Sequence, residues 1–167
     1  MSPDGDGPAG GDGNDDGAGD GRLVAIAAVH PSQLYVDAAR LRELWEWFDV
    51  AAPSYDPIPV FAPGRFDTDC PVLADGHTRA LAAVVAGHDR LRVRAVTDAE
   101  REAWPLGVYE TCVGWCVEAG VTRPRDLVGR VVTRERFLRA WTRRCYGPEA
   151  HPGDPADVIL PDGGAPG

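Results

Sequence analysis

The sequence contains no lysine: all 17 of its basic residues are arginines, and they lie between Arg22 and Arg144. No run of apolar residues is long enough to span a bilayer, and the first residues lack the basic and apolar regions of a signal peptide. We therefore expect a cytoplasmic protein that has no membrane partner and keeps its four cysteines reduced.

Apolar residues are also scarce at both ends of the chain. Glycine and aspartate dominate residues 1–21, and such a segment cannot offset its ordering entropy, so we expect a disordered acidic tail. Residues 148–167 are similar in character and are expected to form a second disordered tail. Six acidic residues precede Arg22 and four follow Gly147, which leaves 16 of the 26 acids against 17 arginines. The net charge of −9 therefore belongs to the tails, and the part between them is close to neutral.

Between the tails, apolar periodicity predicts an α+β fold. The expected elements, in chain order, are a strand at 23–29, a helix at 37–48, strands at 58–61 and 71–74, a helix at 78–86 and a strand at 91–96. Asp37 is placed to cap the first helix, and Gly87 is placed to end the second. Strict alternation in the last strand predicts one solvated face.

The residues that follow have a helical pattern. Thr97 and Glu100 have the spacing of a capping box, which starts a helical turn. Further helices are expected at 106–119, 123–129 and 133–145, with Thr122 and Thr133 as caps of the last two. We therefore predict a small domain with a mixed sheet at 22–97 and a helical extension at 98–147 packed on it.

The stretch "VLADGHTRALAA", residues 72–83, carries the strongest functional signal. A strand that passes through a glycine turn into a helix presents unpaired N–H groups and the positive end of the helix dipole to an anion. Gly76 would allow close approach of the backbone, while His77, Thr78 and Arg79 can donate to phosphate oxygens. Asp75 can serve as a Mg²⁺ ligand, as a base, or as the cap of the helix.

A purely structural interpretation of the same residues stays open. In it, Asp75 is the N-cap of the helix, His77 is a polar turn residue, and Arg79 is a solvated neighbour.

The pattern "HPSQL", a helix, "IPV", "VLADGHTRALAA" and "LRVRAV" resembles the domain shared by the ParB N-terminal region, sulfiredoxin and an archaeal ADP-dependent serine kinase. The resemblance covers about residues 22–97 and implies a ParB/sulfiredoxin-like fold that binds a nucleotide, such as ADP, ATP or CTP, together with Mg²⁺. It implies phosphate binding by Gly76, His77, Thr78 and Arg79. The chemistry of the residues themselves makes Asp75 and His77 the candidate catalytic residues, with Asp75 as the candidate Mg²⁺ ligand and His77 able to shuttle a proton.

Departures from the family pattern narrow the expected activity. His77 stands where sulfiredoxin has its catalytic cysteine, and "GHTR" stands where chromosome-partitioning ParB has Gly-Glu-Arg-Arg. Asp75, Gly76, His77 and Arg79 match the serine kinase. However, the segment that carries its general-base glutamate is here "HPSQLY". Ser32 and Gln33 therefore form a secondary site segment that offers no carboxylate base.

Three function hypotheses follow. The first is a nucleotide-binding protein that acts in phosphoryl transfer or nucleotide hydrolysis, and the second is a regulatory module that binds a nucleotide without turnover. The third is a DNA-associated module that uses the eight arginines between Arg123 and Arg144. Cys112, Cys116 and Cys145 lie on apolar helix stripes, so we expect buried thiols and no zinc.

Overall fold

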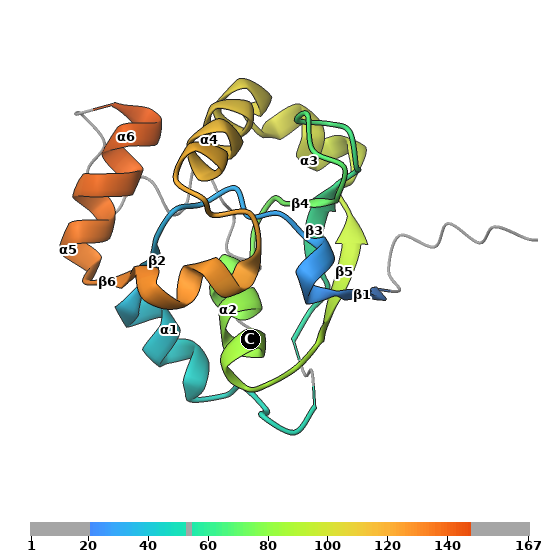
Figure 1. The fold of residues 1–167 in the computed structure, drawn as a ribbon, viewed down its shortest axis with the longest axis vertical. Coiled ribbons are helices and arrows are strands. Elements are labelled where there is room, and N and C mark those ends of the chain that lie inside the picture. Colours follow the sequence, from blue (N-terminus) through green and yellow to red (C-terminus); the bar gives the residue numbers. More distant parts are fainter. Residues whose placement is uncertain (1–20, 53–54, 148–167) are drawn as a thin grey trace, which may run out of the picture.

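The computed structural model of the chain describes residues 21–52 and 55–147. The two expected disordered tails, at 1–21 and 148–167, lie outside the described residues apart from Gly21. The described part has an α+β fold, as predicted, with a mixed sheet and a helical C-terminal extension (Figure 1).

The sheet has four strands in the order β1-β5-β3-β4. The strands are β1 (Arg22–Ala25), β3 (Ile58–Phe61), β4 (Val72–Leu73) and β5 (Arg90–Ala95). The strand β5 runs antiparallel to β1 and parallel to β3, and β4 runs antiparallel to β3. This arrangement brings the end of β4, where the Asp75–Arg79 turn begins, next to the interior strand β3.

The alternation in β5 has the predicted consequence. Leu91 and Val93 are fully buried, whereas Arg90 is exposed and Arg92 and Arg94 are half-buried. One face of the strand therefore contributes to the core and the other carries arginines toward solvent.

The first strand is shorter than its apolar sequence predicts. It ends at Ala25 and passes into the 3₁₀ turn η1 (Ile26–Ala28), instead of continuing to Val29. The backbone N–H of Ile26 donates to Asp89, but the N–H of His30 already donates to Pro71 before β4. The chain thus leaves β5 and crosses to the opposite edge of the sheet, which a continuous strand could not do.

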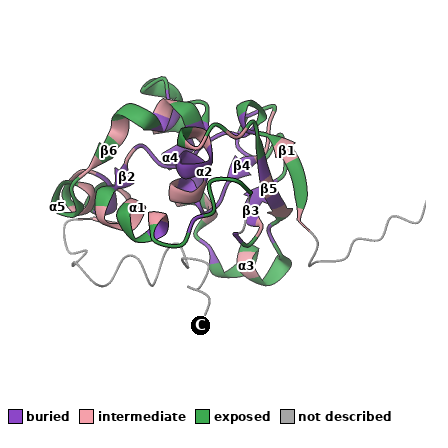
Figure 2. Ribbon diagram, turned by 90° about the horizontal axis from the view of Figure 1, so that it is seen from below, coloured by how far each residue is buried: buried purple, intermediate pink, exposed green. Residues whose placement is uncertain are grey.

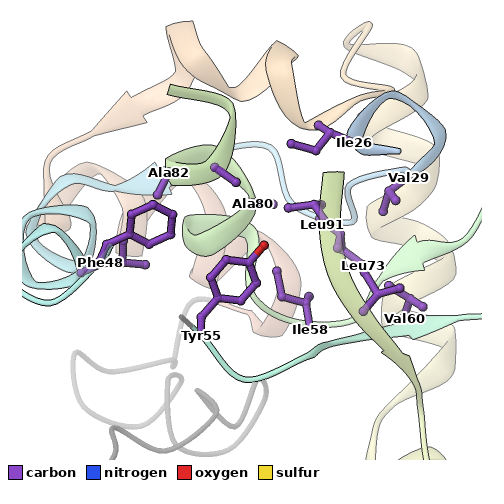
Figure 3. Packing of buried hydrophobic residues seen from close by; sticks show 13 residues of the cluster. Ile26, Val29, Phe48, Tyr55, Ile58, Val60, Leu73, Ala80, Ala82 and Leu91 are labelled. Atoms are coloured by element: carbon purple, nitrogen blue, oxygen red, sulfur yellow. The ribbon is translucent and has the colours of Figure 1, made fainter. Parts of the chain in front are cut away.

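Two helices build the main core together with the sheet. Helix α1 (Ala38–Trp45) begins at Asp37, whose carboxylate accepts from the N–H of Ala39, so the predicted cap is confirmed. Helix α2 (His77–Val85) packs against α1 and β5. Figure 3 shows Phe48, Tyr55, Ile58 and Leu91 converging on the small residues of α2.

The extension differs from its predicted form in two places. It contains α3 (Asp98–Ala103), α4 (Leu106–Glu118), η2 (Pro124–Arg130), β6 (Val131–Val132), α5 (Arg134–Phe137), η3 (Leu138–Thr142) and α6 (Arg143–Tyr146). The α-helix expected at 123–129 is a 3₁₀ helix, and its N-cap is Arg123 and not Thr122. The Asp126 carboxylate accepts hydrogen bonds from the backbone N–H groups of both residues. The last helix contains a π-helical turn, η3, between α5 and α6.

The extension shares its core with the sheet domain. The segment β2 (Val36–Asp37) pairs in parallel with β6, a contact that sequence periodicity did not predict. Leu34, Val36 and Leu81 from the first part pack with Cys116, Leu127 and Trp141 from the extension. A second shared cluster joins Phe61 and Val72 to Trp104, Tyr109 and Val113. Figure 2 shows the buried residues running through both parts.

No helix within 21–52 and 55–147 is both long enough and apolar enough to cross a bilayer.

Candidate functional site

Gly76 makes the turn between β4 and α2. Its backbone is left-handed, with φ 73° and ψ 23°, and it occupies the N-cap position of α2. A Cβ at this residue would lie 2.9 Å from Ile58 Cγ2 and 3.0 Å from Arg79 Nη2. Both the backbone angle and the space therefore require glycine. The interpretation of Asp75 as the N-cap fails, since that position belongs to Gly76.

Arg79 folds back over this glycine. Its Nη2 lies 3.0 Å from Asp75 Oδ2, and its Nη1 donates to the carbonyl of Asp56 at 3.2 Å. The side chains are only 11% exposed for Arg79 and 7% for Asp75, so Arg79 is not a solvated neighbour. The hydrogen bond to Asp56 holds the chain around that residue against the turn. Arg79 Nε also faces the turn, because it lies 3.1 Å from the Cβ position of Gly76.

His77 points into the protein and ties the turn to the segment that carries Ser32. The N–H of Ser32 donates to His77 Nε2 at 3.0 Å, and the Ser32 hydroxyl donates to the carbonyl of Leu73 at 2.6 Å. Because Nε2 accepts, the ring proton lies on Nδ1. The structure thus brings the predicted secondary segment beside the predicted turn.

The environment of His77 keeps the imidazole neutral. Burial lowers its pKa from 6.5 to about 3, and the positive charge of Arg79 and the nearby His30 act in the same direction. A neutral ring whose Nε2 already accepts a backbone hydrogen bond cannot donate from that atom to a phosphate. The contribution of His77 to a ligand would come from its backbone N–H, at the first turn of α2.

Thr78 and Gln33 differ in what they can offer a ligand. Thr78 is half-buried, and its hydroxyl has no hydrogen-bond partner among the residues that the structure describes. Gln33 is buried, and its amide donates to the carbonyl of Tyr35 at 2.5 Å, within its own loop. Thr78 is therefore the side chain of the turn best placed to bind a ligand.

Three further residues lie at or near the turn, and sequence reasoning did not assign them to it: Tyr109 bonds to it, and Arg94, the ion-pair partner of Glu100, interacts electrostatically with Asp75. The hydroxyl of Tyr109, on α4, donates to the carbonyl of Ala74 at 2.9 Å. Arg94 and Glu100 form a two-bond ion pair, and the hydrogen bonds from Arg94 lower the pKa of Glu100 to about 2. Glu100 is visible in the sequence as a capping-box residue, but Tyr109 appears there only as part of an apolar stripe.

The arginine-rich segment is used in part to attach the extension. Within the described residues, three intramolecular contacts of this kind are Arg130 with the Ala119 carbonyl, Arg134 with Asp37 at 2.9 Å, and Arg144 over the Trp115 ring at 4.0 Å. These three arginines therefore make contacts within the protein. Fewer of the eight arginines are available to bind a polyanion than the sequence suggests.

The donor groups at the turn do not make a resident metal site. No group of three or more His, Cys, Asp or Glu side chains with metal-binding geometry occurs within 21–52 and 55–147. Asp75 Oδ2 is moreover engaged by Arg79. A Mg²⁺ ion at this turn would therefore need most of its ligands from bound phosphates and water, as is usual for nucleotide-bound magnesium.

Comparison with known proteins adds little to this geometry. No family model matches the sequence, and no curated protein matches it significantly. Among solved structures, the chain is similar to the crystal structure of protein Atu1540 from Agrobacterium tumefaciens. The two share 17% identity and a TM-score of 0.40, over 78% of this chain and 70% of that one.

Proposed function

We propose that this protein binds a nucleotide by its phosphates at the turn formed by Asp75, Gly76, His77, Thr78 and Arg79. The observation that carries the proposal is the left-handed Gly76 at the start of α2. It starts a nine-residue helix directly after a strand, and the first N–H groups and the dipole of such a helix attract an anion. The resemblance to the ParB/sulfiredoxin-like domain supports a nucleotide as the anion.

The donors available at the turn fit a phosphate group. The Thr78 hydroxyl and the first N–H groups of α2 supply hydrogen bonds, and Arg79 supplies positive charge from within the same turn. Arg79 uses two of its N–H groups on Asp75 and Asp56. An arginine has five N–H donors, so it can also contact a ligand without leaving this position.

Binding without turnover fits the site better than phosphoryl transfer. A transfer reaction needs a base that reaches the acceptor, but His77 is neutral, fully buried and bonded to Ser32. Asp75 is paired with Arg79, and Ser32 donates its hydroxyl proton to Leu73. We therefore favour a regulatory nucleotide-binding module, and catalysis by Asp75 would require it to exchange Arg79 for Mg²⁺.

The test is calorimetry of the full chain with ADP, ATP and CTP, each with and without Mg²⁺. Thr78→Val removes the hydroxyl at nearly constant shape, so affinity should fall by roughly threefold to tenfold, the worth of one hydrogen bond. Thr122→Val is the matched control, because Thr122 is exposed and, among the described residues, its side chain has no hydrogen bond and its backbone N–H donates to Asp126. The control should bind as the wild type does.

Two outcomes contradict the proposal: no nucleotide binds, or Thr78→Val binds with unchanged affinity. Release of inorganic phosphate from a bound nucleotide would instead establish turnover. Tight, steeply salt-dependent DNA binding without nucleotide binding would favour the DNA-associated alternative.

A further inference from the structure

Two cysteines far apart in the sequence meet between α4 and α6. The Sγ atoms of Cys112 and Cys145 are 3.5 Å apart, although the residues are 33 positions apart in the chain. Both are free thiols, as are Cys70 and Cys116. The contact is thus a dithiol pair between two helices, and not a neighbouring pair on one helix.

Aromatic packing fixes this contact. Trp115 on α4 and Trp141 on η3 meet edge to face, with ring centroids 6.1 Å apart. Arg144 lies over the Trp115 ring, with its guanidinium carbon 4.0 Å from the ring centroid. The π-helical turn that contains Trp141 precedes Cys145 by one turn and sets the face that α6 presents to α4. The two thiols are therefore held side by side by the packing around them.

A small cavity opens beside the pair. It has a volume of about 20 Å³ and is lined by both thiols, Ser32, Tyr109, Trp141 and Tyr146, among others. This space admits about one water-sized molecule, which is close to the size of hydrogen peroxide. Ser32 also bonds to His77, so the cavity lies directly behind the candidate turn.

We propose that Cys112 and Cys145 are a reversible oxidation site that closes to a disulfide across the α4–α6 contact. With hydrogen peroxide as oxidant, one thiol attacks the O–O bond and becomes a sulfenic acid, with release of one water. The second thiol then attacks that sulfur, forming the S–S bond and releasing a second water. Two thiols lose two electrons and two protons, and one peroxide is reduced to two waters.

The surroundings disfavour the thiolate form of Cys145 at neutral pH. The hydrogen bond with Cys112, followed by burial, raises the pKa of the Cys145 thiol, and the thiolate is the reacting form. Burial similarly raises the pKa of Cys116 to about 12. Attack by Cys145 therefore becomes faster as the pH rises.

The test uses the full-length wild type, reduced and then treated with hydrogen peroxide or diamide. Thiol titration under denaturing conditions should fall from four thiols to two, and intact mass should fall by two hydrogens. Cleavage after arginine releases a peptide that begins at Cys145. This peptide should be found joined to the one that contains Cys112 and Cys116, and fragmentation should place the bond at Cys112.

Single cysteine variants show which thiols form the disulfide. Cys116→Ala and Cys70→Ala should still form the bond, whereas Cys112→Ala and Cys145→Ala should retain all their remaining thiols. Closing a loop of this length should also raise the melting temperature of the oxidised wild type by about 10 °C, reversibly on reduction. Four titratable thiols after oxidation, or a bond from Cys116 or Cys70 to Cys145, would overturn the proposal. The wild-type mapping decides this even if a variant fails to fold.

Discussion

The burial of His77 predicts how the free energy of unfolding depends on pH. In the folded protein its pKa is lowered to about 3, against 6.5 for an unfolded chain. Above about pH 6.5 the ring is neutral in both states and contributes nothing to the pH dependence. Below that value the unfolded chain takes up a proton that the folded chain cannot, so the free energy of unfolding falls with pH.

The size of the effect follows from the two pKa values. Between about pH 8 and about pH 5, the loss due to His77 alone is about 2 kcal/mol, since the slope approaches about 1.4 kcal/mol per pH unit. Burial also lowers the pKa of His30, which therefore adds to the loss in the same direction. The window stops at about pH 5 because below it carboxylates such as Glu100, whose pKa is lowered to about 2 in the fold, take up protons in the unfolded chain first and also lower the stability.

The assay is urea unfolding at several pH values across this window, on the wild type and on His77→Gln. A glutamine oxygen can accept the Ser32 N–H as Nε2 does, but it does not titrate. The variant should therefore lose about 2 kcal/mol less than the wild type between the two ends of the window. Equal pH slopes for the two proteins, or an imidazole of His77 that titrates near 6.5 by NMR, would refute the buried, neutral assignment.

The other predictions concern the turn itself and are checked by chemical unfolding of each variant. Gly76→Ala places a Cβ 2.9 Å from Ile58 at a positive φ, so it should cost about 1–3 kcal/mol and weaken nucleotide binding. Arg79→Ala removes the ion-pair partner of the buried Asp75 carboxylate and should lower the free energy of unfolding by about 3 kcal/mol. Adding Asp75→Asn to this variant should recover part of the loss. An Arg79→Ala protein of wild-type stability would contradict the buried ion pair. Tyr109→Phe removes the hydrogen bond to the carbonyl before Asp75 and should cost about 1 kcal/mol, a loss that an exposed tyrosine would not produce.

The Arg79 prediction also changes how the candidate site should be probed. From the sequence alone, replacing Arg79 is expected to have little effect on the fold, because an arginine one turn into a helix is usually solvated. The structure makes Arg79 part of the scaffold, since it bonds to Asp75 and to the Asp56 carbonyl. Loss of nucleotide binding in Arg79→Ala would therefore mix a lost contact with a damaged turn. Thr78→Val separates the two effects.

Local signals in the sequence determined much of the secondary structure. Asp37, Thr97 and Thr133 each accept a backbone N–H at the start of a helix, as their positions predicted. The alternation of β5 was equally readable. These features depend on residues within four positions of one another, where side-chain chemistry and backbone angles suffice.

Only the tertiary structure decided how these elements meet. Val36 pairs with Val131, His77 accepts from Ser32, and Cys112 contacts Cys145, all across long stretches of chain. No periodicity records such contacts, because each depends on how separate apolar faces pack together. The same packing decided that His77 is a neutral buried acceptor and that Arg79 is a structural ion-pair partner, since burial and charge neighbours, and not residue type, set the pKa and the accessibility of each group.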